Sequence, residues 1–159
     1  MSIREHPLAW RWTDPKHVKF APDVLSQIAP LDAFTAAAVH DRWMPYFDRY
    51  GEVIREHFAS IEVCSTEGTW KGDACSRQTL LIEQVADWLR IREPNLSLPV
   101  TISWQRDCAV RTTWGIFTRW WDDFCYPISD DAFIVADTPR WFLAFHHEDL
   151  FSFCHNPAA

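Results

Sequence analysis

The sequence predicts an α+β fold in which a mainly helical N-terminal half packs on a small antiparallel sheet supplied by the C-terminal half. As far as about position 92, apolar residues recur at steps of three and four, the spacing of an amphipathic helix. After about position 98 the pattern changes to that of short strands, and residues 99–104 alternate apolar and polar residues as a half-buried strand does. Helices gathered on one side of an antiparallel sheet are typical of the α+β class.

Proline and capping residues delimit the helices of the N-terminal half. Pro22 suits the first turn of one helix, and Ser76 is a suitable N-cap for another. Residues 61–64 fit either a strand or a helix end, and the first twenty residues are expected to form an irregular arm with the rings of Trp10 and Trp12 packed. The expected helices cover residues 22–29, 31–43, 46–59 and 76–92.

The C-terminal half is expected to contain four strands and one embedded helix. Thr112 or Thr113 is suited to cap a Trp-rich helix that extends to about Phe124. Polar residues at 129–131 favour a turn directly before the second strand. The expected strands cover residues 99–104, 132–136, 141–147 and 150–154.

Composition indicates one domain over residues 1–159. The chain is 48% hydrophobic and contains ten Trp and eleven Phe, which is ample for a single core. No linker-like stretch interrupts the sequence, and four Gly in total argue against a Gly-rich phosphate loop.

Charge and cysteine usage restrict the class of partner and the compartment. A formal net charge of −7 disfavours nucleic acid as a partner and permits a basic protein. The first residues lack an apolar signal segment, and no apolar run is long enough for a membrane span. Five irregularly spaced cysteines indicate reduced thiols, so we expect a cytoplasmic protein; they are Cys64, Cys75, Cys108, Cys125 and Cys154.

The densest group of reactive residue types lies at 146–149. On a strand, His146 and Glu148 share one face while His147 and Asp149 share the other, so at most two of them reach one metal ion. A zinc site needs three or four ligands, and we therefore expect neither a metal nor another cofactor. Cys125 is expected to be a poor nucleophile because it follows a helix C-terminus beside carboxylates.

Carboxylates concentrate around an aromatic turn and form the candidate partner-binding site. Asp122, Asp123, Asp130 and Asp131 lie within ten residues of one another and bracket Tyr126. Such a surface attracts a basic partner through charge and anchors it through aromatic rings. The sequence therefore favours a non-catalytic binding protein with a site at these five residues.

The segment from Arg111 to His155 resembles small bacterial proteins, some of which are similar to immunity proteins of polymorphic or contact-dependent toxin systems. The resemblance is carried by TRWWDDFCYP at 118–127 and WFLAFHHED at 141–149. It implies a small cytosolic protein that binds and neutralises one cognate toxin. Two alternatives remain open at this stage: a small enzyme with a site around His146–Glu148, and a structural or assembly subunit.

Overall fold

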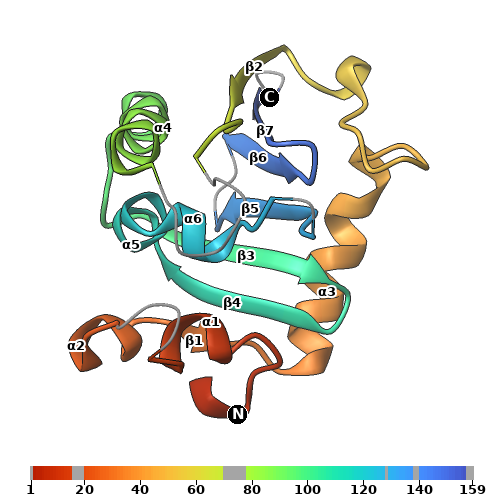
Figure 1. The fold of residues 1–159 in the computed structure, drawn as a ribbon. Helices are drawn as coiled ribbons and strands as arrows, with labels where there is room; N and C mark the ends of the chain where they lie inside the picture. Colours follow the sequence, from red (N-terminus) through yellow and green to blue (C-terminus); the bar gives the residue numbers. More distant parts are fainter. Residues whose placement is uncertain (1, 16–19, 70–77, 128, 138–139, 157–159) are drawn as a thin grey trace.

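The strands form one seven-stranded antiparallel sheet with the order β1-β4-β3-β5-β6-β7-β2 (Figure 1). The computed structural model describes residues 2–15, 20–69, 78–127, 129–137 and 140–156. In chain order the strands are β1 (Ala29–Pro30), β2 (Ser60–Ser65), β3 (Pro99–Gln105), β4 (Cys108–Thr113), β5 (Ala132–Ala136), β6 (Trp141–His146) and β7 (Leu150–His155).

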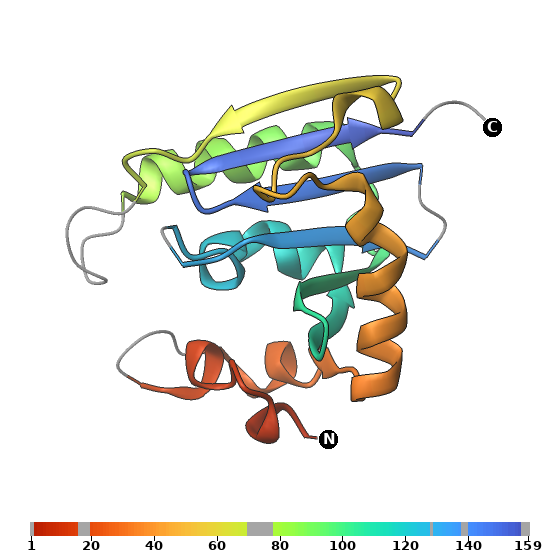
Figure 2. The same ribbon diagram turned by 90° about the vertical axis from the view of Figure 1, so that its right-hand side faces the viewer.

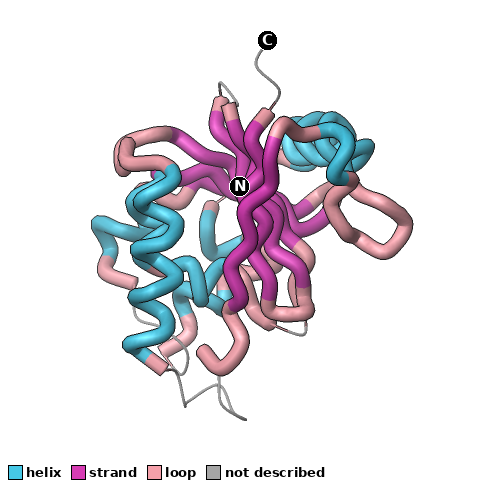
Figure 3. The backbone as a smooth tube through the Cα atoms, turned by 90° about the horizontal axis from the view of Figure 1, so that it is seen from above, coloured by secondary structure: helices cyan, strands magenta, loops and turns pink. Residues whose placement is uncertain are grey.

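Helices cover both faces of this sheet, as Figure 3 shows. One face packs against α4 (Thr79–Arg92), α5 (Trp114–Arg119) and α6 (Trp121–Phe124), and the other packs against α3 (Ala33–Trp43). The remaining helical segments are short; they are η1 (Ile3–Glu5), α1 (Trp10–Thr13), α2 (Pro22–Leu25), η2 (Met44–Tyr46) and η3 (Arg55–His57). In Figures 1 and 2 the N-terminal segments lie beside β4, at the edge of the sheet that is opposite the edge strand β2.

Residue alternation along the strands divides the core into two layers. In β5, Ile134 belongs to the larger layer under α4 and α5, whereas Phe133 belongs to the smaller layer under α3. Both faces of β5 and of most of β6 are therefore buried, which explains their continuous apolar sequences. Phe142 is fully buried at the centre of the smaller layer, and the rings around it are those of Trp43, Tyr46, Phe47, Phe58 and Phe133.

The α+β class is confirmed, and the sheet is larger than the sequence predicts. Two strands from the N-terminal half, β1 and β2, form its edges, and the ambiguous segment 61–64 is part of β2. Strand β4 was not predicted from the sequence. The helices do not gather on one side, because both faces of the central strands are apolar.

The prediction of a helix over residues 46–59 is wrong. Asp48 Oδ1 accepts hydrogen bonds from the backbone N–H groups of Tyr50 and Glu52, at 2.7 and 3.0 Å, which closes a turn instead of a helix. Gly51 then has a φ of 81°, a conformation in which a residue with a Cβ atom is strained. The aromatic residues that suggested helical spacing here reach the core from irregular backbone.

The helix expected over 22–29 is shorter, since α2 ends at Leu25, and the expected Trp-rich helix is divided into α5 and α6. Two other helices agree closely with the expected ones. The helix expected over 31–43 is α3, which Asp32 caps by accepting a hydrogen bond from the Thr35 N–H at 2.9 Å. The helix expected over 76–92 is α4, although its expected cap, Ser76, lies outside the described residues. In the N-terminal arm, Trp12 is fully buried, whereas Trp10 is 39% exposed. Among the described helices, none has the length and apolar character that crossing a membrane requires.

Candidate functional site

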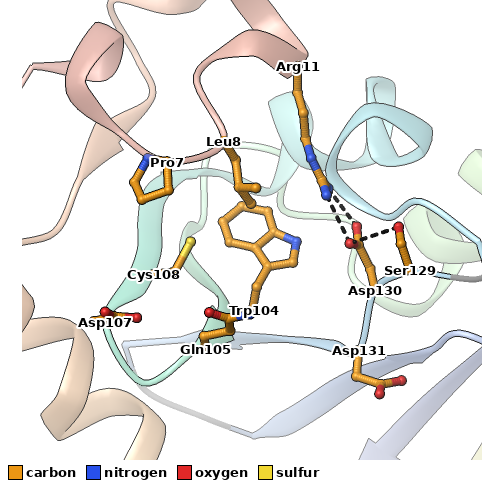
Figure 4. A pocket seen from close by; sticks show the side chains of 10 residues that line it. All are labelled: Pro7, Leu8, Arg11, Trp104, Gln105, Asp107, Cys108, Ser129, Asp130 and Asp131. Atoms are coloured by element: carbon orange, nitrogen blue, oxygen red, sulfur yellow. Dashed lines mark hydrogen bonds and ion pairs between the residues drawn. The ribbon is translucent and has the colours of Figure 1, made fainter.

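A cavity of about 480 Å³ lies where the N-terminal arm meets one end of the sheet (Figure 4). Three separate parts of the chain line it: the arm before and within α1, the end of β3 with its turn into β4, and the segment directly before β5. We call it the Trp104 pocket, and its lining residues are Pro7, Leu8, Arg11, Trp104, Gln105, Asp107, Cys108, Ser129, Asp130 and Asp131.

A buried ion pair between Arg11 and Asp130 closes one side of the pocket (Figure 4). The guanidinium donates to both carboxylate oxygens, at 2.5 and 2.9 Å, and one of its nitrogens also donates to the Phe124 carbonyl at 3.2 Å. The ring of Tyr126 lies over the guanidinium, 4.2 Å from its central carbon, and the Tyr126 N–H donates to Asp130 at 2.8 Å. This pair therefore fastens the arm to the C-terminal half and compensates the charge of Asp130.

Trp104 supplies the aromatic wall of the pocket. Its indole Nε1 donates to the Phe124 carbonyl at 2.9 Å, and its ring is stacked against that of Phe124 with an interplanar angle of 12°. These contacts hold the half-buried ring in one orientation. An immobilised indole face is a suitable surface for a flat apolar or cationic group.

The pocket carries more negative than positive charge. Asp107, Asp130 and Asp131 contribute carboxylates, against the single guanidinium of Arg11. Asp107 is exposed in the β3–β4 turn, and in the described part of the chain it has no hydrogen-bond or ion-pair partner. Asp131 is also exposed, and it contacts His147.

The described cysteines are poorly suited to nucleophilic chemistry. Burial, followed by the charge of Asp107, raises the pKa of the Cys108 thiol to about 11, although His6 Nε2 lies 3.8 Å from its sulfur. Burial also raises the pKa of Cys154 to about 12 and that of Cys64 above its ordinary value. The pKa of Cys125 is raised as the sequence indicates, but burial is the main cause and nearby carboxylates are secondary.

The five residues predicted to bind a partner do not form one exposed surface. Asp122 and Asp123 are buried within the short helix α6, and Asp130 is buried against Arg11. Tyr126 is half-buried on the Arg11 guanidinium, so Asp131 is the exposed member. The premise of four surface carboxylates is therefore wrong, and the assignment of this segment to partner binding stays a prediction.

The expected arrangement of the histidines is also wrong. β6 ends at His146 and the chain turns at 147–149, where Asp149 has a φ of 60°. Because the turn interrupts strand alternation, the rings of His146 and His147 are 4.2 Å apart instead of on opposite faces. A hydrogen bond from His147 Nδ1 to Asp131 spans 2.9 Å, and this contact raises the pKa of His147.

The comparisons with known proteins give one family. A family model described as "Protein of unknown function (DUF2947)" matches residues 1–153. Neither the curated proteins nor the solved structures contain a match to the chain.

Proposed function

The chain belongs to the DUF2947 family, and we propose that it is a non-catalytic binding protein whose Trp104 pocket takes a basic side chain of a protein partner. The observation that carries this proposal is the composition of the pocket: three carboxylates and one guanidinium surround a fixed indole ring. That combination attracts a cation and offers it an aromatic face.

Each pocket group has a separate part in this proposal. Asp130 is already neutralised by Arg11, so Asp107 and Asp131 are the pocket carboxylates that remain for an incoming guanidinium or ammonium group. The Trp104 ring stacks on that group, a contact worth about 0.5–2 kcal/mol depending on how far water is excluded. The net charge of −7 accelerates the approach of a basic protein at low salt.

The partner class that we propose is a basic toxin domain, which makes the chain an immunity protein. The resemblance of the segment from Arg111 to His155 to proteins of toxin systems supports this, as does the acidic balance of the chain. The pocket adds a position for one anchoring side chain at the centre of such an interface. Buried anchors that are surrounded by weaker polar contacts are typical of tight protein interfaces.

The proposal can be tested before a partner is known, with Nα-acetyl-arginine amide as the probe. In a titration followed by NMR, we expect the Trp104 indole N–H and the Asp107 amide to shift. Nα-acetyl-citrulline amide has the same shape without the charge, and it should shift them far less. Equal responses to the two probes, or no response to either, would overturn the proposal.

Matched variants connect these shifts to the pocket. Asp107→Asn removes one pocket charge, whereas Glu83→Gln makes the same change in charge on α4, where Glu83 is exposed. We expect Asp107→Asn to weaken arginine amide binding and Glu83→Gln to leave it unchanged. If both variants weaken binding equally, the attraction is a property of the net charge and not of the pocket.

A further inference from the structure

A second group of side chains lies beside the Trp104 pocket and has a different chemistry. Asp131, His146 and His147 each offer a metal-ligand atom, and the three atoms lie within 4.8 Å of one another. The antiparallel register explains how they meet. Ala132 of β5 pairs with Phe145 of β6, so Asp131 lies opposite His146, and His147 follows in the turn.

His146 has a ring nitrogen without a partner. Its Nε2 atom is buried and makes no hydrogen bond in the described structure, and its side chain is 15% exposed. Such a buried polar atom costs free energy unless something binds it. The other ring nitrogen, Nδ1, accepts a hydrogen bond from the Glu148 backbone N–H at 3.3 Å, and a Glu148 carboxylate oxygen lies 4.0 Å from it. With Nδ1 as the acceptor, the neutral ring carries its proton on Nε2. Metal binding through Nε2 therefore requires that proton to move to Nδ1, where a hydrogen bond to the Glu148 carboxylate replaces the one from the Glu148 N–H.

We propose that Asp131, His146 and His147 bind one divalent first-row transition-metal ion of the zinc class. Zinc is bound at about 2.0–2.2 Å by imidazole nitrogen and carboxylate oxygen, so its ligand atoms lie about 3.3 Å apart in a tetrahedral site. Asp131 Oδ1 and His147 Nδ1 are 2.9 Å apart, and the three ligand atoms lie within 4.8 Å, so zinc binding requires the side chains to move to that spacing. Two imidazoles and one carboxylate suit zinc, iron and cobalt better than magnesium or calcium.

Neighbouring groups support the ligands and leave room for a further one. The His147 backbone N–H donates to Asp131 Oδ1 at 3.0 Å, which orients the carboxylate. A hollow of about 240 Å³ is lined by His146 and Glu148, and another of about 180 Å³ is lined by Asp131. Gly51 borders both hollows. Three protein ligands beside open space are typical of sites that keep one coordination position for water or a substrate.

Zinc binding to the purified full-length chain tests this directly. After treatment with a chelator, calorimetric titration with Zn²⁺ should give one ion per chain and a raised melting temperature. Loss of a carboxylate beside a ligating imidazole already costs about 10–100-fold in affinity, so His146→Ala and His147→Ala should each cost more than about 100-fold. Titration with Co²⁺ should give the visible absorption of a four-coordinate ion, and each variant should abolish it.

His155→Ala is the matched control. His155 is also hydrogen-bonded to a carboxylate, Glu62, at 3.0 Å, and its exposure of 39% is close to the 42% of His147. The His155→Ala variant should bind zinc with the same affinity as the unaltered chain. If zinc binds equally to all variants, or does not bind the unaltered chain, the proposal is wrong. His147→Gln, which preserves side-chain bulk, separates the loss of a ligand from unfolding when compared by circular dichroism.

Discussion

Replacing Asp130 with alanine should destabilise the fold severely, although Asp130 lies in a turn-like segment of an acidic protein. Its carboxylate and the Arg11 guanidinium are 7% and 5% exposed. The variant leaves the guanidinium buried without its counter-charge and removes the acceptor of the Tyr126 N–H. Removing one member of a buried ion pair costs about 3–5 kcal/mol. This is a large part of the roughly 5–15 kcal/mol by which domains are stable.

An exposed pair provides the comparison. Arg106 and Asp41 also form a short ion pair, at 2.8 Å, but their side chains are 68% and 51% exposed. Exposed pairs contribute about 0–1 kcal/mol, so Asp41→Ala should have a small effect. Urea denaturation followed by Trp fluorescence measures both variants, with an unchanged dependence on urea as the check for two-state unfolding.

A double variant distinguishes a stranded charge from a simple loss of packing. Adding Arg11→Met to Asp130→Ala removes the uncompensated guanidinium, so the double variant should be more stable than Asp130→Ala alone. The reasoning is refuted if Asp130→Ala costs as little as Asp41→Ala. It is also refuted if Arg11→Met makes the Asp130→Ala protein less stable.

Three other predictions concern the core and the thiols. Phe142→Ala should cost about 3–5 kcal/mol in urea denaturation, because it opens a cavity among five aromatic rings. Gly115→Ala should cost about 1–3 kcal/mol in the same assay, since its Cβ would lie 2.9 Å from the Leu96 carbonyl oxygen. Cys108, with a thiol pKa of about 11, should resist iodoacetamide at pH 8 in the native state and react after denaturation; mass spectrometry of the labelled peptides measures both.

Local sequence patterns were sufficient for elements whose burial is regular. Strand β5 was predicted from a short apolar run after a polar turn, and helices α3 and α4 were predicted from apolar residues at helical spacing. The helix prediction for residues 46–59 failed because the aromatic residues there have helical spacing, whereas the backbone forms a turn. Hydrogen bonds from backbone N–H groups to the Asp48 side chain close that turn. A periodic pattern indicates which residues are buried. It does not establish a helix, because irregular backbone can bury the same residues.

The candidate site was predictable only where its residues are close in sequence. Asp130 and Asp131 were selected because acidic residues cluster there, and both line the pocket. Trp104 and Arg11 were not selected, because sequence spacing contains no information on which distant segments meet. The same limit hid the third member of the histidine cluster: Asp131 reaches His146 through strand pairing across 15 residues of chain.

Asp131 connects the two proposals, and this has a measurable consequence. Its carboxylate lines the Trp104 pocket and also belongs to the cluster with His146 and His147. A bound divalent ion would replace negative by positive charge at that edge of the pocket and so weaken the binding of a cation. Linkage requires the reciprocal effect: arginine amide must weaken zinc binding by the same factor.

We therefore expect saturating zinc to reduce arginine amide affinity in the unaltered chain but not in His146→Ala. Because His146 does not line the pocket, its replacement leaves the pocket charges in place. Equal arginine amide affinities with and without bound zinc would show that Asp131 does not serve both sites.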